Sequence, residues 1–260
     1  MEICSLASGS GGNCTFVSSG GTNILIDAGI SLRRIKSALR SLNKSMEDIS
    51  AILITHEHSD HTKALRMISK YYNTPVFATS GAKTVISYYY PELSGAIGSF
   101  EAGDGLNVGS FDIHSFPTPH DASSVGFRIN DSEKSFFIAT DMGFVTKNIY
   151  RNSLGADFAM IESNHDIEML MSGPYPYYLK QRILSEKGHL SNADCARLVS
   201  ALAKEGTKRF LLAHLSKENN TPSLAYNEVS RALEENGFSV GNDVYLDVAP
   251  GDDMTARYII

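Results

Sequence analysis

Residues 55–61 have the sequence Thr-His-Glu-His-Ser-Asp-His and bring four candidate metal ligands within six positions: His56, His58, Asp60 and His61. They follow the apolar run Ala51–Ile54, which is typical of a short buried strand, so we expect the ligands on the loop that leaves this strand. Side chains two positions apart point the same way in an extended chain. His56 and His58 can therefore bind one metal while Asp60 and His61 turn towards a second. Two neighbouring divalent ions held by imidazoles and carboxylates form a site for hydrolysis.

Three further candidate ligands each follow a strand-like apolar run: His120, Asp141 and His214. Upstream, Asp27 ends the apolar run that begins at Ile24 and precedes Ala28-Gly29. Together with residues 56–61, these motifs resemble in their order the metal-binding motifs of the metallo-β-lactamase superfamily. One His-x-His-x-Asp-His motif is only moderately specific, whereas five motifs in order are much more so.

The resemblance implies how the ligands divide between two divalent metal ions. The first ion would be bound by His56, His58 and His120. The second would be bound by Asp60, His61 and His214, and Asp141 would bridge the two. The mixture of imidazole and carboxylate ligands suits zinc, manganese or iron. Asp27 would support the histidine loop by hydrogen bonds, and the alternative is a simple turn before Gly29.

Strand and helix patterns cover the whole chain. Strands are predicted around Asn107 and at Cys4–Ala7, Thr15–Ser18, Ile24–Asp27, Ala51–Ile54, Phe111–Phe116, Val125–Ile129, Phe136–Thr140, Phe158–Glu162 and Phe210–His214. A helix is expected from Leu32 to Leu42, because Leu32, Ile35, Leu39 and Leu42 recur at helical spacing. A second helix is expected over residues 61–72. Met171–Tyr178 is expected to be a short aromatic loop over the active site. The series suits two packed sheets with helices outside, and the resemblance implies the α/β four-layer (αβ/βα) sandwich, as one domain over residues 1–260.

Composition points to an ordinary globular enzyme, with 42% hydrophobic and 20% charged residues. No apolar run approaches the roughly 20 residues of a membrane helix, and no signal peptide is expected at Met1–Ser5. Three cysteines cannot form a disulfide framework, so we expect a reduced, cytoplasmic protein. The net charge of −6 argues against a broad basic nucleic-acid surface, but it allows a phosphate-bearing substrate near the metals.

The segment Lys187-Gly188-His189-Leu190-Ser191 resembles an element of tRNase Z and of the PhnP-type phosphodiesterases. In those proteins the His binds no metal and faces the departing oxygen of a phosphodiester. The resemblance therefore implies that His189 is a general acid. The alternative is structural, because Ser191 can cap a helix that begins at Asn192, with Asp194 in its first turn. Both can hold together.

Three other segments have candidate substrate contacts and equally plausible structural roles. In the sequence Glu-Ser-Asn-His-Asp, Asn164 and His165 line the site and contact phosphate in one interpretation. In the other, the segment is a polar loop in which Asn164 or Asp166 caps the next helix. Residues 8–13, Ser-Gly-Ser-Gly-Gly-Asn, form either a hairpin turn or an anion-binding nest with Ser10 and Asn13. Lys180, Arg182 and Lys187 either contact a nucleic-acid backbone or form a solvated helix face.

Several segments together resemble one branch of the superfamily, the YycJ (WalJ) family: residues 5–10, 56–61, 140–143, 162–166, 173–176, 188–192 and 214–222. The resemblance implies a metal-dependent phosphodiesterase, namely a 5′-to-3′ exonuclease that acts on double-stranded DNA in repair. Asp60 would orient the attacking water and His189 would protonate the leaving oxygen. The alternatives are a carbon ester, thioester or lactone hydrolase like glyoxalase II, or a phosphodiesterase for RNA or small cyclic substrates.

Overall fold

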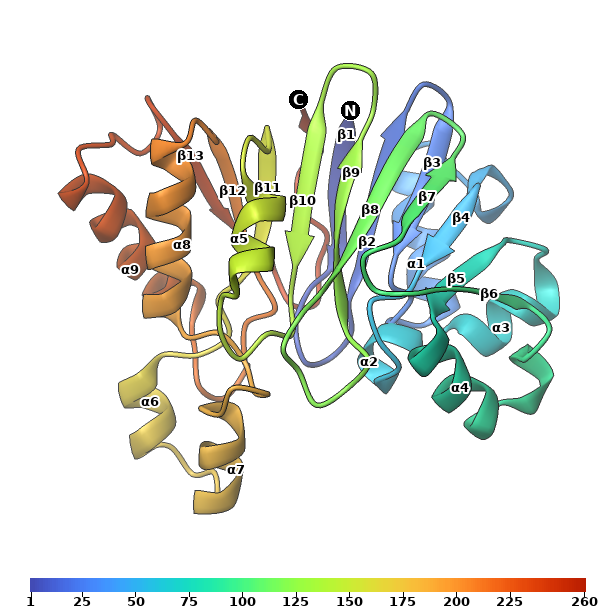
Figure 1. The fold of residues 1–260 in the computed structure, drawn as a ribbon, viewed down its shortest axis with the longest axis horizontal. Coiled ribbons are helices and arrows are strands. Elements are labelled where there is room, and N and C mark those ends of the chain that lie inside the picture. The colour runs from blue at the N-terminus through green and yellow to red at the C-terminus, as the bar shows by residue number, and fades with distance from the viewer.

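Two seven-stranded sheets pack face to face in the computed structural model, which describes residues 1–260 (Figure 1). The first sheet has the order β14-β1-β2-β3-β4-β5-β6 and consists of β14 (Tyr258–Ile259), β1 (Glu2–Ala7), β2 (Cys14–Ser19), β3 (Thr22–Ile26), β4 (Ala51–Leu53), β5 (Val76–Thr79) and β6 (Ile97–Phe100). The second has the order β13-β12-β11-β10-β9-β8-β7 and consists of β13 (Tyr245–Val248), β12 (Arg209–Ala213), β11 (Phe158–Glu162), β10 (Ser135–Ala139), β9 (Val125–Asn130), β8 (Phe111–Pro117) and β7 (Gly105–Val108).

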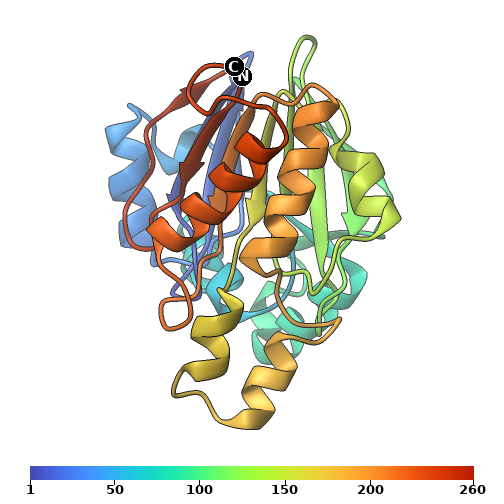
Figure 2. The same cartoon turned by 90° about the vertical axis from the view of Figure 1, so that its left-hand side faces the viewer.

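Helices cover the outer faces of both sheets. Those beside the first sheet are α1 (Leu32–Ser41), α2 (Ser59–Thr62), α3 (Leu65–Tyr71) and α4 (Ser80–Tyr89), with short 3₁₀ turns at Met46–Asp48 and Pro91–Leu93. Those over the second are α5 (Lys147–Ser153), α8 (Asn192–Lys204) and α9 (Pro222–Glu235). The remaining two, α6 (Ile167–Ser172) and α7 (Tyr177–Ile183), extend beyond the end of the sandwich (Figures 1 and 2). The predicted four-layer sandwich is confirmed.

Alternation along the strands explains the layers. In β10, Phe136 and Ile138 pack between the two sheets, whereas Phe137 packs under α5 and α8. In β3, Ile24 and Ile26 face the space between the sheets while Leu25 faces the helices of its own side. Successive side chains of a strand point to opposite faces. Strands covered on both sides are therefore mostly apolar, as Ile24–Ile26 and Phe136–Ala139 are.

Two expectations from the sequence were wrong in detail. Residues 61–72 form two helices, α2 and α3, and not one. The break has a local cause: Ala64 donates its N–H to the Ala28 carbonyl at 2.8 Å, and the Asp60 carbonyl accepts from Asn13 at 2.8 Å, so the continuous helical hydrogen bond between Ala64 and Asp60 is absent. The aromatic segment 171–178 is not a plain loop, because its two ends belong to α6 and α7.

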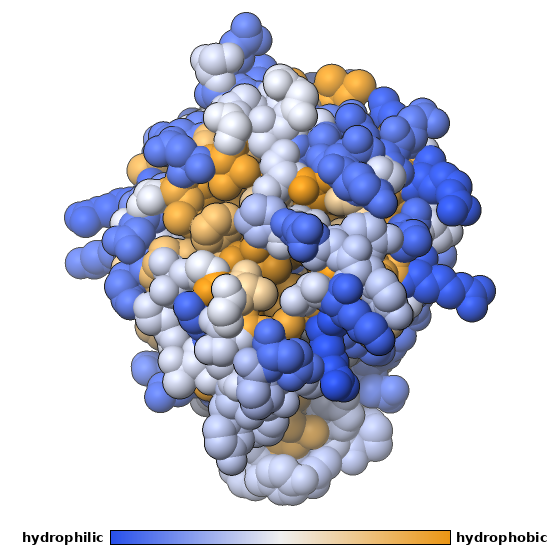
Figure 3. Space-filling view, turned by 90° about the vertical axis from the view of Figure 1, so that its right-hand side faces the viewer, coloured by the Kyte–Doolittle hydropathy of each residue, from blue (hydrophilic) through white to orange (hydrophobic).

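None of the helices has the length and apolar character that a membrane span needs. The face that carries α3 and α4 is mostly polar, with apolar side chains in several places, most of them from its upper left to its middle (Figure 3).

Candidate metal centre

The predicted ligands gather at one edge of the sandwich, where several strands end together. Asp27 and His214 directly follow β3 and β12, and Asp141 follows β10 after Thr140. All three residues have a left-handed backbone, with φ of 62°, 56° and 56°. Asp and His tolerate this conformation better than most residues, and such strain is typical of functional sites. The left-handed residue ends each strand abruptly and leaves its side chain at the edge.

The histidine loop, residues 55–61, provides the ligands of the first predicted set. His56 Nε2 and His58 Nδ1 lie 3.0 Å apart, and His120 completes a group whose ligand atoms are within 4.8 Å of one another. Gly29 allows the loop to pack this closely, because a Cβ there would lie 1.6 Å from the Asp60 carbonyl oxygen. The structure thus places these three rings around one common point.

The second predicted set is also brought together. The ligand atoms of Asp60, His61 and His214 lie within 4.8 Å of one another. Asp141 lies between the two sets, since its Oδ2 is 3.4 Å from His61 Nε2 and its Oδ1 is 3.9 Å from His120 Nε2. This is the position that a bridging carboxylate requires.

Buried acceptors fix the orientation of the imidazoles. Nδ1 of His61 donates to Asp27 at 2.8 Å, Nδ1 of His120 to the Gly188 carbonyl at 3.1 Å, and Nδ1 of His214 to Glu162 at 2.9 Å. Each such bond selects the tautomer whose Nε2 lone pair faces the centre, which is the usual arrangement of metal-binding histidines. The predicted role of Asp27 fits this pattern, and Asp27 also accepts from the Thr55 N–H at 2.8 Å.

The donor atoms of the site suit a metal cation. His120 Nε2, Asp141 Oδ2 and His214 Nε2 are buried and have no hydrogen-bond partner in the protein. Buried polar atoms rarely lack a partner, and three of them converging here fit a divalent ion. Burial opposes a charge on His61, but the carboxylates of Asp27 and Asp141 outweigh it and raise its pKa to about 10. The same negative field favours a bound cation.

Glu162 is a central residue to which the sequence analysis gave no role. It is fully buried and accepts from the backbone N–H groups of Met142 at 2.9 Å and Leu190 at 3.2 Å, besides His214. It also accepts from His189 Nδ1 at 2.8 Å. Burial raises the pKa of Glu162, but these histidines outweigh that effect and hold it below its ordinary value. The available signal was its place at the end of β11, between the strands that lead to Asp141 and His214.

His189 lines the cavity beside the ligands. Its Nδ1 is held by Glu162, so its Nε2 remains without a protein partner. Burial lowers the pKa of His189, but the charge and hydrogen bond of Glu162 outweigh it and raise the pKa above the ordinary value. The predicted capping by Ser191 is also present, since Asp194 donates its N–H to the Ser191 hydroxyl at 3.1 Å.

A cavity of about 280 Å³ opens onto the ligands. Among the candidate substrate contacts, Ser10 and Asn164 line it. Asn13 lies behind it, with its side-chain amide 3.1 Å from His61 Nε2, and Lys187 is exposed outside it. His165 is also not in the lining; it is buried, and burial lowers its pKa to about 4. Cap formation belongs to Asp166, which accepts from the Met169 N–H at 2.7 Å.

Asp121 is a second residue to which no role was given. Its Oδ1 lies 3.3 Å from His120 Nε2 and 3.7 Å from His58 Nε2, while its Oδ2 accepts from Arg182 Nε at 2.9 Å. Arg182 therefore lies in the cavity wall, whereas Lys180 turns to the Met171 carbonyl at 2.7 Å. The predicted basic cluster is thus divided between the cavity, α6 and solvent.

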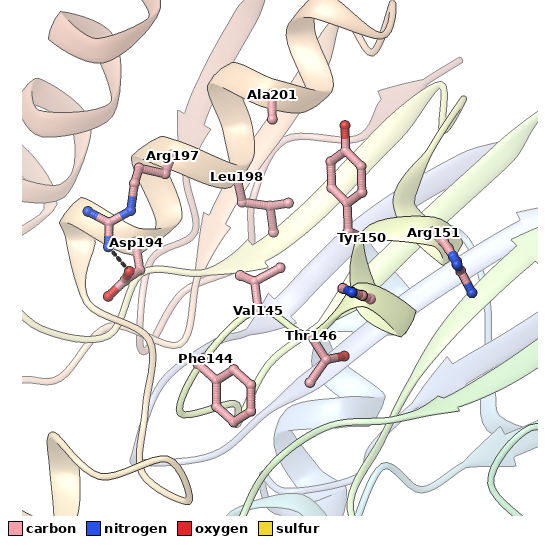
Figure 4. A pocket seen from close by; sticks show the side chains of 10 residues that line it. Phe144, Val145, Thr146, Tyr150, Arg151, Asp194, Arg197, Leu198 and Ala201 are labelled. Carbon is pink, nitrogen blue, oxygen red and sulfur yellow. Dashed lines mark hydrogen bonds and ion pairs between the residues drawn. The ribbon is translucent and has the colours of Figure 1, made fainter.

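A larger cavity of about 510 Å³ lies elsewhere, between α5 and α8. Figure 4 shows Asp194, Arg197, Leu198 and Ala201 of α8 on one side of it and Tyr150 of α5 on the other. None of the candidate metal ligands lies in its wall. The chemistry therefore belongs to the smaller cavity at the strand ends.

Comparison with known proteins places this geometry in context. A family model described as "Beta-lactamase superfamily domain" matches residues 22–215. The chain is 37% identical to "Exodeoxyribonuclease YycJ" of Bacillus anthracis, over 100% of this chain and 99% of that protein. It is 40% identical to "Exodeoxyribonuclease WalJ" of Streptococcus pneumoniae, over 94% of this chain and 93% of that one. Among solved structures, a diphosphatase of the PhnP family has a TM-score of 0.68 at 15% identity, over 99% of this chain and 98% of that one, which shows a shared fold.

Proposed function

The chain belongs to the β-lactamase superfamily and, within it, to the family of the YycJ and WalJ exodeoxyribonucleases, and from this we propose that it is a metal-dependent phosphodiesterase that degrades double-stranded DNA from its 5′ ends. We propose two divalent ions, zinc, manganese or iron, bound by the two ligand sets described above. A cytoplasmic location is part of the proposal, and three buried, unpaired cysteines are consistent with a reducing compartment.

The observation that carries the proposal is the arrangement of His189 above the ligands. Its ring lines the cavity, Glu162 holds Nδ1 at 2.8 Å, and Asp141 Oδ1 lies 3.6 Å from the same nitrogen. A thioesterase needs no such acid at this place, because a thiolate leaves without a proton. A phosphodiester whose leaving group is a sugar alkoxide does need a proton.

The chain's own residues then have distinct tasks. When bound, the two ions would activate a water molecule and polarise a phosphoryl oxygen. Asp60 would orient this water molecule, and Asp141 would hold both ions. His189 would donate the proton from Nε2 to the departing oxygen, while Glu162 keeps the ring in place and favours its protonated form. Ser10 and Asn164 are placed to contact phosphate oxygens, since both line the cavity.

Processing from a strand end follows from the size of the site. A cavity of about 280 Å³ holds little more than a terminal nucleotide, and we propose that residues 1–260 form a single domain without an added clamp. The net charge of −6 leaves few cations for the phosphate backbone, so affinity should depend only modestly on salt.

The test is a comparison of substrates with the purified protein and added manganese or zinc. Linear duplex DNA labelled at its 5′ ends should be degraded to short products, while a covalently closed circle stays intact. Equal cleavage of the circle would overturn the exonuclease proposal. Rapid turnover of lactones or thioesters, with DNA left intact, would instead favour the glyoxalase-like alternative.

A further inference from the structure

The hairpin of α6 and α7, residues 167–183, exposes unusually many apolar side chains. Exposed fractions are 45% for Ile167, 47% for Met171, 73% for Tyr177 and 74% for Tyr178. The hairpin extends beyond the sandwich at the same end as the metal centre (Figures 1 and 2). Scattered exposed apolar residues are normal on a soluble protein, but a concentrated group indicates a binding surface.

This hairpin is part of the catalytic cavity and not merely close to it. Tyr175, Leu179, Arg182 and Ile183 all line the cavity that contains His189 and Asp141. Tyr177 and Tyr178 follow Tyr175 after Pro176 and are the first two residues of α7. A polymer with one phosphate in the cavity can therefore reach α7 when it leaves.

The composition of α7 suits a nucleic acid. Its sequence, Tyr-Tyr-Leu-Lys-Gln-Arg-Ile, has two cations and no carboxylate, in a chain whose net charge is −6. Exposed aromatic rings next to basic side chains are typical of surfaces that bind unpaired bases, because every base has a face on which a ring can stack.

The hairpin is also held in place before any ligand binds. Leu170 and Ile183 are buried at its base, and Lys180 Nζ donates to the Met171 carbonyl at 2.7 Å, which joins α7 to α6. Pro174 and Pro176 restrict the connection between the two helices. Rings fixed in this way lose little freedom when they bind.

We propose that Tyr177 and Tyr178 form a stacking platform for the bases of the DNA strand whose phosphate occupies the catalytic cavity. This inference rests on the proposed function, and it specifies how the enzyme would hold the end of its substrate. Stacking on the platform would compete with base pairing at the duplex end and favour entry of a single strand into the cavity.

The chain offers a matched control. Tyr88 and Tyr89 are another adjacent pair of exposed tyrosines in a helix, with exposed fractions of 79% and 69%. They belong to α4, and neither lines the catalytic cavity. Alanine is a better helix former than tyrosine, so both double substitutions should leave the fold intact.

The experiment compares Tyr177→Ala/Tyr178→Ala with Tyr88→Ala/Tyr89→Ala in the full chain. With linear duplex DNA, the first double variant should raise KM about 5-fold to 100-fold, the range for losing one base stack, and the second should leave it unchanged. Hydrolysis of bis-p-nitrophenyl phosphate, which has no bases, should be equal in all proteins. Tyr177→Phe/Tyr178→Phe should restore the DNA KM, since stacking needs the ring and not the hydroxyl.

Other outcomes are separable. An unchanged KM, or an equal rise in both alanine pairs, would overturn the platform. So would a wild-type dimer that the Tyr177→Ala/Tyr178→Ala change dissociates without affecting KM, because the hairpin would then bind a second copy of the chain. If the wild-type protein leaves DNA intact, the proposed function itself fails, and the platform with it.

Discussion

The two halves of the metal centre are assembled in opposite ways. The histidine loop contributes His56, His58, Asp60 and His61 from one six-residue stretch. The strand-end half gathers Asp141, Glu162, His189 and His214 from four separate segments at the carboxyl ends of neighbouring strands and a loop. A local motif is visible in a sequence by itself, whereas the strand-end half exists only because β10, β11 and β12 are adjacent and parallel.

Each half nevertheless depends on one buried carboxylate. Asp27 holds the histidine loop through the Thr55 backbone and His61. Glu162 holds the other half through two backbone N–H groups and the rings of His189 and His214. Asp27 therefore supports one ligand ring directly, while Glu162 supports one ligand and the candidate acid. Substitutions can test whether this difference has the consequences that the geometry suggests.

The largest effect is expected for Asp141→Ala, because Asp141 is the residue that touches both halves. Its loss should remove at least one metal ion per chain and lower turnover at least about 10⁴-fold, since a bound metal stabilises transition-state charge by several kcal/mol. Elemental analysis of protein purified without chelators gives the metal content. Full metal occupancy in this variant would contradict the bridging position.

His189→Ala should separate chemistry from metal binding in the strand-end half. Both ions should stay, while turnover of DNA falls about 10²-fold or more, as expected for a lost general acid. The deficit should shrink on a nitrophenyl phosphodiester, whose leaving group needs no proton. An equal loss on both substrates would mean that His189 positions phosphate or supports the loop.

Substitutions of the two supporting carboxylates, Glu162 and Asp27, should have smaller effects than the two changes above, and these effects should differ from each other. Glu162→Gln should lower turnover and metal affinity roughly 10-fold to 100-fold, the range for residues that hold ligands. Asp27→Asn should lower turnover and metal affinity about 10-fold or less. Asn tolerates the φ of 62°, and the substitution weakens the direct support of only one ring. Metal titrations and steady-state rates on both variants check the order. A larger loss for Asp27→Asn would reverse the comparison.

The sequence predicted the histidine loop more readily than the strand-end half. The fold class, and the seven candidate ligands that the structure brings together, could be predicted because the motifs follow apolar strands in a recognisable order. Glu162 received no role, since it belongs to the strand itself and its partners come from residues 142, 189, 190 and 214. In the sequence, only the neighbouring His120 indicates a role for Asp121, because the contact between Asp121 and Arg182 spans 61 positions. The split between α2 and α3 depends on backbone bonds to Ala28 and Asn13, which no local pattern shows.

The smallest effect concerns the backbone and should have opposite signs in the two halves. Asp141 has φ of 56°, where an alanine is strained by roughly 1–2 kcal/mol and a glycine is not. Glycine loses about 0.5–1 kcal/mol more on folding than alanine, because its unfolded chain is freer. Asp141→Gly should therefore unfold with a free energy about 0.5–1 kcal/mol higher than Asp141→Ala.

At His58 the backbone is ordinary, with φ of −60° and ψ of 150°, so only the unfolded-chain effect remains. The free energy of unfolding of His58→Gly should therefore be about 0.5–1 kcal/mol lower than that of His58→Ala. Urea unfolding of the four metal-free proteins measures the difference, and removal of metal prevents unequal binding from obscuring it. Differences of the same sign at both positions would mean that the strand-end half stores no strain. Opposite signs would show that the histidine loop presents its ligands on relaxed backbone, while the strand ends present theirs at a conformational cost that the fold must offset.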